Sequence, residues 1–205
     1  MEADAVTFMD GLADVDETLG FLGYSGRKPT QEMLNRILAL KKFLEPKLVP
    51  KTYYEVSDIV RREKSIFVFG SSIELAGKSI AEHLANSDKA AICIETLSET
   101  VDTVIEEAQK QDMSDALILD ALANSAVETL RKKTEKRVSA ENPLYDINWQ
   151  FGIGYGDLSI KLLEPVLEKL DAQKRIGLGT NGHDIMVPLK SAAGIIGMHN
   201  RNRIA

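Results

Sequence analysis

The pattern of apolar and polar positions predicts a helix between Thr30 and Pro46. Apolar residues recur there at intervals of three and four, which places them on one face of a helix: Met33, Leu34, Ile37, Leu38 and Leu44. Thr30 belongs to the residue types that cap helix N-termini, and a proline does not continue a helix. The segment is therefore predicted to be amphipathic and helical.

Strand and helix patterns then alternate along the chain. Residues 52–59 are rich in Tyr and Val, and residues 65–69 form a short apolar run before Gly70, so both are predicted to be strands. Residues 73–84 fit a helix, residues 90–96 a buried strand, and residues 99–110 a helix capped by Ser98.

The longest periodic segment follows Ser114. Its apolar side comprises Ala116, Leu119, Ala123, Ala126, Val127 and Leu130. Residues 131–137 form a mostly basic end, which suits the dipole at a helix C-terminus, and Asn142 with Pro143 breaks the pattern.

Helix and hairpin signals close the chain. Residues 159–170 are helical in pattern but contain Pro165, so a kink or a restart is expected there. Two apolar stretches, residues 175–178 and 184–189, flank a turn-forming segment at residues 179–182, which predicts a hairpin. These local signals indicate a mixed α and β protein, without internal repeats.

Composition narrows the class of protein. The chain has 205 residues with 25 Lys and Arg against 31 Asp and Glu, a formal charge of −6. This size suits one domain, and the acidic balance argues against a nucleic-acid partner. The first residues lack the pattern of a signal peptide, and no uncharged run is long enough for a membrane span, so we expect a cytoplasmic protein. Cys93, the one cysteine, lies in an apolar run and is predicted to be a buried thiol.

Several kinds of chemistry lack support in the sequence. Gly177, Gly179 and Gly182 have the spacing of a dinucleotide fingerprint, but the residues that follow resemble a strand instead of the required helix, so NAD is not expected. The three histidines are scattered singly, which argues against a metal site. A Gly-x-Ser-x-Gly nucleophile motif is absent, so we assign no catalytic residue.

Residues 152–156, Gly-Ile-Gly-Tyr-Gly, form the most suggestive segment. Its glycines allow a backbone to approach a ligand closely, and Trp149, Phe151 and Tyr155 would provide an aromatic wall for a flat nucleoside or amino-acid group. The alternative is a glycine-rich bend that packs its aromatic residues into the core. Spacing alone leaves both interpretations open.

Read together, several segments resemble the activation domain of cobalamin-dependent methionine synthase, including free-standing proteins that consist of that domain alone. The matching pieces occur in the family's order, at residues 19–26, 77–84, 99–102, 115–130, 154–157 and 188–191. The resemblance covers about residues 14–197. It implies a single domain over residues 1–205 with an α+β fold, in which helices flank a twisted, mainly antiparallel sheet.

The resemblance also implies a function. Domains of this family bind S-adenosylmethionine and dock over the cobalamin of a partner domain. When the cobalt is in the inactive cob(II)alamin state, one electron, from flavodoxin in some systems, and the methyl group of S-adenosylmethionine restore methylcobalamin. The chain would then be a stand-alone reactivation subunit for methionine synthase or another corrinoid protein, in methionine biosynthesis, and not a complete enzyme. Its task would be to position the sulfonium methyl group and exclude water.

The family's motif Arg-x-x-x-Gly-Tyr corresponds to residues 150–155, but Gln150 stands in place of the arginine. An arginine suits a ligand carboxylate through paired charged hydrogen bonds, and its loss costs about 1.5 to 3 kcal/mol. In this alignment Tyr155 would pack on the ligand, and the backbone near Gly152 would contact adenine or ribose. Gly154 and Gly156 complete the loop.

Two carboxylates, Asp16 and Glu128, align with ligand-side acidic residues of the family and would attract the cationic end of S-adenosylmethionine. The alternatives are that Asp16 is an ordinary surface or cap residue and that Glu128 is an i,i+3 partner of Arg131.

Two other functions remain open at this stage. The first is a non-catalytic docking module for a corrinoid protein that has lost S-adenosylmethionine, as Gln150 would permit. A cation elsewhere, such as Arg137 or Lys190, that reached the place of the missing arginine would argue against it. The second is a protein that binds a different small ligand in the same cleft, because fold analogy does not determine a ligand.

Overall fold

The computed structural model describes residues 11–24 and 26–202. The first residues, on which the absence of a signal peptide was judged, and Ser25 of the segment at residues 19–26 lie outside this range. The helical elements are α1 (Val15–Phe21), α2 (Gln31–Leu44), η1 (Glu45–Lys47), α3 (Lys78–His83), α4 (Glu99–Gln111), α5 (Met113–Glu141), η2 (Ile160–Leu162), α6 (Leu163–Lys169) and α7 (Ala172–Ile176). The strands are β1 (Lys51–Glu63), β2 (Ile66–Phe69), β3 (Ile73–Ala76), β4 (Lys89–Thr96), β5 (Tyr145–Ile147), β6 (Phe151–Gly152), β7 (Gly179–Thr180), β8 (Met186–Val187) and β9 (Ser191–Asn200).

Seven of the described strands form one sheet in the order β3-β2-β1-β4-β9-β5, with β6 also paired to β9. Every neighbouring pair is antiparallel. The short strands β7 and β8 form a separate hairpin. The predicted α+β class with a mainly antiparallel sheet is therefore confirmed.

Strand β4 forms the centre of the sheet. All of its residues after Lys89 are buried, because it pairs with β1 on one side and β9 on the other and is covered on both faces. The run of Ala, Ile and Cys in this strand suits such a position, whereas Glu95 is an exception with no exposed surface.

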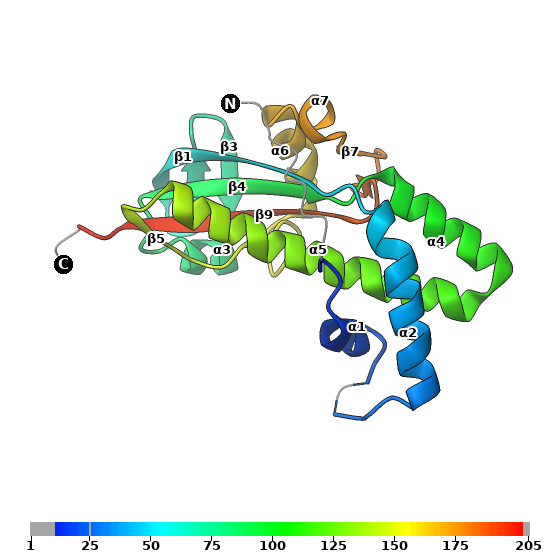
Figure 1. Ribbon diagram of the computed structural model, residues 1–205. Helices are drawn as coiled ribbons and strands as arrows, with labels where there is room; N and C mark the ends of the chain where they lie inside the picture. Colours follow the sequence, from blue (N-terminus) through cyan, green and yellow to red (C-terminus); the bar gives the residue numbers. More distant parts are fainter. Residues whose placement is uncertain (1–10, 25, 203–205) are drawn as a thin grey trace.

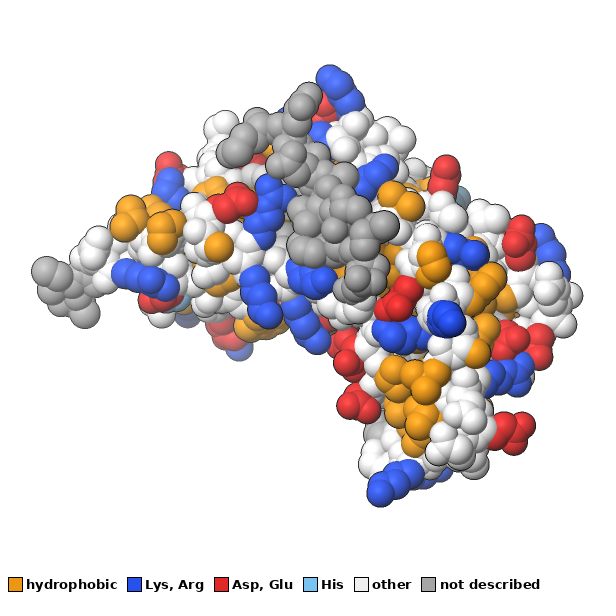
Figure 2. All heavy atoms as spheres, viewed as in Figure 1, with side chains coloured by type: hydrophobic (Ala, Val, Ile, Leu, Met, Phe, Trp, Pro, Cys, Tyr) orange, Lys and Arg blue, Asp and Glu red, His pale blue; other side chains and the backbone are white. Residues whose placement is uncertain are grey.

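Helices cover the two faces of the sheet (Figure 1). Helix α5 crosses one face and continues past the sheet, where α1, α2 and α4 pack around it. Helices α3, α6 and α7 pack with strands β2, β3 and β4 in a separate apolar core. Figure 2 shows hydrophobic side chains gathered over α2, whose Leu38 and Phe43 are exposed.

Most predicted elements are confirmed. Thr30 caps α2 by accepting a hydrogen bond from the Met33 amide at 3.2 Å, and Pro46 ends the helix. Helix α5 spans 29 residues and ends at Glu141, with Asn142 as its C-cap, so the basic residues 131–137 lie before its last turn, which has no basic residue. The η2 and α6 helices show the expected restart, with Pro165 in the first turn of α6. Ser98 precedes α4, but its hydroxyl donates to the Val49 carbonyl and does not cap the helix.

Three predictions of secondary structure were wrong or incomplete. Residues 73–84 form a strand and a short helix, because Gly77 adopts φ 149°, which breaks the segment. The hairpin exists, but residues 175–178 mostly belong to the end of α7 and the turn that follows, so its strands are only β7 and β8. Strand β9, which pairs with β4 along its length, was not predicted from the residue pattern, and the family match at residues 188–191 includes only its first residue, Ser191.

Candidate functional site

The loop of residues 150–156 runs beside the central part of the sheet. Phe151 and Gly152 form β6 and pair with Ile195 and Gly194 of β9. The amide of Ile153 continues this pairing with a 3.1 Å hydrogen bond to the Ala193 carbonyl. The start of the loop is therefore anchored on regular structure.

Tyr155 lies with its ring over Gly152. Its amide donates to the Gly152 carbonyl at 3.2 Å, and a Cβ atom on Gly152 would lie 2.6 Å from ring carbon Cδ2 of Tyr155. Gly154 and Gly156 have φ values of 87° and 57°, which favour glycine and allow the tight turn. The tyrosine is 71% exposed, so this aromatic surface is open to a ligand.

Gln150 is held by three separate contacts. Its side chain is buried and donates from Nε2 to Oε2 of Glu95 at 3.2 Å. Its amide donates to Oε1 of Glu135 at 2.8 Å, and its carbonyl accepts from Nη1 of Arg131 at 2.9 Å. The side chain thus points into the protein, where it lies beside Glu95 of β4 and Gly194 of β9.

Glu128 is the partner of Arg131 that the alternative interpretation named. Its Oε2 accepts hydrogen bonds from Nη2 and Nε of Arg131 at 2.7 and 3.2 Å. Because Arg131 also holds the Gln150 carbonyl, this pair brings Glu128 close to the loop. Its carboxylate remains about one-third exposed, at 34%.

Asp16 lies on the exposed side of α1. Asp14 caps this helix, and its backbone exchanges hydrogen bonds with the Ser125 hydroxyl of α5. Glu17 accepts from Lys132 at 3.0 Å, so α1 lies along the stretch of α5 that also carries Glu128. Helix α1, which carries Asp16, thus packs against helix α5, which carries Glu128.

Aromatic rings continue from the loop toward α3. The rings of Trp149 and His83 are 4.9 Å apart, and that of Phe151 lies 5.4 Å from each of them. Phe151 belongs to the apolar core, as the interpretation of a core-packing bend predicts. Trp149 is 59% exposed, as the interpretation of an aromatic wall for a ligand predicts. Burial lowers the pKa of His83.

Asp157 anchors the far end of the loop to α3. Its carboxylate accepts from the amides of Ser79 and Lys78 at 3.0 and 2.6 Å. These bonds lower the pKa of Asp157. Both ends of the loop are therefore fixed, one by β9 and α5 and the other by α3.

Neither Arg137 nor Lys190, the two cations named from the sequence, reaches residue 150, where the family has its arginine. Arg137 pairs with Glu141 at 2.7 Å, and Lys190 pairs with Asp120 at 2.7 Å. Arg131 is the cation that reaches residue 150, although it contacts the backbone carbonyl there.

The other negative predictions concern metals and membranes. Among residues 11–24 and 26–202, no group of three or more His, Cys, Asp or Glu side chains could hold a metal ion. No helix in this part of the chain is long and apolar enough to span a membrane.

The glycines with the spacing of a dinucleotide fingerprint lie in a helix end and a hairpin. Gly177 ends α7 and Gly179 belongs to the β7–β8 hairpin, as predicted for a turn.

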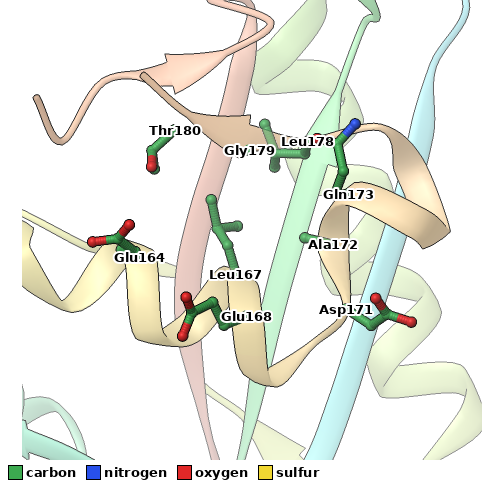
Figure 3. A pocket seen from close by; sticks show the side chains of 9 residues that line it. All are labelled: Glu164, Leu167, Glu168, Asp171, Ala172, Gln173, Leu178, Gly179 and Thr180. Atoms are coloured by element: carbon green, nitrogen blue, oxygen red, sulfur yellow. The ribbon is translucent and has the colours of Figure 1, made fainter. Parts of the chain in front are cut away.

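A cavity of about 370 Å³ lies elsewhere, between α6, α7 and β7 (Figure 3). Glu164, Glu168 and Asp171 stand at its edges, and Leu167 and Leu178 form an apolar floor. It shares no residue with the loop, and its acidic side chains are exposed. The cavity is thus a separate feature, and none of the residues predicted from the sequence lines it.

Sequence reasoning missed Glu95 and the backbone contacts of Arg131 and Glu135. A glutamate that follows five apolar residues in a strand is a signal for Glu95, because a fully buried carboxyl needs a partner. Burial raises the pKa of Glu95 to about 8, and the charge of Glu135 acts in the same direction. Hydrogen bonds from Gln150 and Thr134 and the charge of Arg131 oppose this rise.

Comparison with known proteins bears on the fold. No family model matches the chain, and no curated protein sequence matches it. Among solved structures, the chain is similar to the MetH reactivation domain bound to AdoHcy, with a TM-score of 0.71 and 11% sequence identity, over 99% of this chain and 79% of that chain. The resemblance stated from the sequence is therefore confirmed at the level of architecture: this chain has the fold of the MetH reactivation domain.

Proposed function

We propose that the chain binds S-adenosylmethionine at the loop of residues 150–156 and serves as a reactivation component for a corrinoid protein. The observation that carries this proposal is the exposed ring of Tyr155 lying over Gly152, in a domain with the fold of the AdoHcy-bound MetH reactivation domain. A flat ring supported by backbone is a suitable surface for an adenine base.

Residues of the loop, of α1 and of α5 suit different parts of this ligand. Tyr155 and the backbone near Gly152 would hold the nucleoside. Asp16 and Glu128 would attract the ammonium and sulfonium charges, and the attraction is stronger at Glu128, which is partly buried, than at the exposed Asp16. Gln150 does not fit the role of the family's arginine, because its buried side chain is bonded to Glu95.

The chain's own contribution would be positioning. When bound, S-adenosylmethionine supplies an electrophilic methyl group, which reductive methylation of cob(II)alamin uses together with one electron. The anchors at Gln150 and Asp157 keep the loop in place, so Tyr155 and Gly152 can orient the ligand with little loss of entropy on binding. In this proposal the cobalamin belongs to a partner, methionine synthase or another corrinoid protein, and the electron comes from a flavodoxin-like donor.

Calorimetric titration with S-adenosylmethionine, and separately with AdoHcy, tests the proposal. We expect micromolar binding by the parent chain and a loss of about tenfold to a hundredfold in Tyr155→Ala, the effect of removing one aromatic stacking surface. Phe43→Ala, which removes an exposed aromatic ring from α2, is the matched control and should bind like the parent. Equal affinities in all three proteins would contradict the role of Tyr155.

The burial of Gln150 favours a second candidate, a corrinoid docking module that no longer binds S-adenosylmethionine. No binding of either ligand by the parent chain, together with association of the parent with a purified corrinoid protein, would favour this candidate. A Gln150→Arg variant that gains binding would then indicate a degenerate site.

A further inference from the structure

The contact between Glu95 and Gln150 leaves two buried oxygens without partners. Glu95 has no exposed surface, Gln150 is 1% exposed, and one hydrogen bond joins Nε2 of Gln150 to Oε2 of Glu95 at 3.2 Å. The Oε1 atom of each side chain is also buried and has no hydrogen-bond partner within the described part of the chain.

Ionised Glu95 cannot satisfy these atoms. A carboxylate only accepts hydrogen bonds, so it has no hydrogen to donate to the amide oxygen of Gln150. Its own second oxygen would keep a share of a negative charge in the core, where unpaired charge is costly. A neutral carboxylic acid differs, because its O–H can donate to the amide oxygen while the amide N–H donates to the carbonyl oxygen of the acid. One proton therefore satisfies both atoms.

The surroundings of Glu95 favour the neutral acid. Its strand neighbours in register are Thr52 of β1 and Ala192 of β9, which carry no charge, and the thiol of Cys93 lies on its own strand. Helix α5 presents Thr134, Arg131 and Glu135, and the Thr134 hydroxyl and the charge of Arg131 favour the ionised form without outweighing burial.

These two charges do not compensate an ionised Glu95. Arg131 already binds Glu128 and the Gln150 carbonyl, and Glu135 adds a second negative charge. Burial raises the pKa of the Glu95 carboxyl to about 8, which agrees with the hydrogen-bond argument.

We propose that Glu95 is protonated in the folded protein at neutral pH and is a positioning residue, which holds the loop of residues 150–156 through a reciprocal acid–amide pair with Gln150. Loss of the proton to solvent base removes one of the two hydrogen bonds and places a negative charge against the amide oxygen. Gln150 directly precedes β6, so release of its side chain loosens the strand that carries Gly152. This inference goes beyond the proposed function, because it concerns the free chain.

Nuclear magnetic resonance on the ¹³C-labelled chain tests the protonation directly. The carboxyl shift of Glu95 should report a neutral acid at pH 7 and titrate with a midpoint near 8. An ionised carboxyl at pH 7 would overturn the proposal, and this measurement needs no variant.

Trp149 supplies a readout of the loop, because it is the one tryptophan of the chain and adjoins Gln150. Its fluorescence should change over the same pH range in the parent chain and in Glu55→Gln, a matched control on β1. In Glu95→Gln, which keeps a reciprocal pair but cannot ionise, the change should be absent. A transition that persists in Glu95→Gln would contradict the positioning role.

Ligand binding separates this inference from the proposed function. If both hold, the affinity for S-adenosylmethionine should be about tenfold weaker at pH 9 than at pH 7 in the parent chain and nearly constant in Glu95→Gln, as expected when only the protonated fraction is competent. Absence of ligand binding at every pH would contradict the proposed function, whereas the titration of Glu95 and the response of Trp149 would still decide the present proposal.

Discussion

Arg131 donates a hydrogen bond from Nη1 to the carbonyl oxygen of Gln150 over 2.9 Å, and the same guanidinium binds Glu128 through Nη2 and Nε. One side chain therefore links α5, a candidate ligand carboxylate and the start of the loop. Because its donors are directed at a backbone atom, the contact depends on the position of the loop and not on the identity of residue 150.

Arg131→Ala should lower the free energy of unfolding by about 1 to 3 kcal/mol, since it removes the one charged hydrogen bond to the Gln150 carbonyl and the two to Glu128. Lys132→Ala is the control, because Lys132 forms an exposed ion pair with Glu17 and such pairs contribute only about 0 to 1 kcal/mol. Urea unfolding followed by circular dichroism measures both. Equal losses in the two variants would show that Arg131 does not hold the loop.

Gly152→Ala should displace the ring of Tyr155, because the new Cβ would lie 2.6 Å from Cδ2 of that ring. The ring is exposed and can turn outward, so we expect nearly unchanged stability and weaker binding of S-adenosylmethionine. Gly20→Ala on α1, where the added atom meets nothing within 4 Å, is the control. Calorimetry on the two variants checks the prediction, and unchanged affinity in Gly152→Ala would argue against a ligand on this ring.

The stability of the fold should decrease as the pH rises from about 4.5 to about 8, through the contribution of Glu95. Its pKa in the folded state is raised above the ordinary value of 4.5, so the unfolded chain releases the proton first and gains stability relative to the folded state over this interval. The difference in unfolding free energy between the parent and Glu95→Gln, measured in urea at several pH values, isolates this contribution. We expect a change of a few kcal/mol, whereas parallel curves would mean that Glu95 titrates normally.

Cys93 should be inert to aromatic disulfide reagents in the folded protein. It is fully buried in β4, and burial raises its pKa well above the ordinary value, so little reactive thiolate is present. Labelling in increasing urea should follow the unfolding curve, with the fully unfolded chain as the reference for complete reaction. Stoichiometric labelling without denaturant within minutes would contradict a buried thiol.

The elements that could be predicted from sequence are those with strong local signals. Thr30 and Pro46 delimit α2, and the apolar period of α5 persists over many turns. Residues 73–84 misled because strand β3 is only four residues long, so its alternation of Ile73 and Leu75 was too short to be separated from the helical pattern that follows it. Strand β9 begins with Ser, Ala, Ala and Gly, small residues whose pattern predicts little, and its identity as a strand depends on β4.

The candidate site divides in the same way. The glycines and Tyr155 were recognised from adjacent residues, and their tight turn is local. The alignment identified Gln150 as the residue in place of the family's arginine, but not the direction of its side chain. That direction depends on the hydrogen bond to Glu95, which is 55 positions away in sequence. Such pairings follow from strand register and helix packing, which a single sequence does not reveal.

The pairing of β4 with β9 has a consequence for synthesis of the chain. Thr96 and Ser191 are partners in this register although they lie 95 positions apart. At ordinary translation rates, on the order of ten seconds pass between the synthesis of Thr96 and that of Ser191. During that interval β4 has an open edge of Ala, Ile and Cys residues, the kind of edge that recruits other strands. Because β6 also pairs with β9, the loop of residues 150–156 lacks its anchor on the sheet until β9 has been made. A ribosome-bound chain that ends before residue 191 should therefore engage chaperones more strongly than one that includes β9.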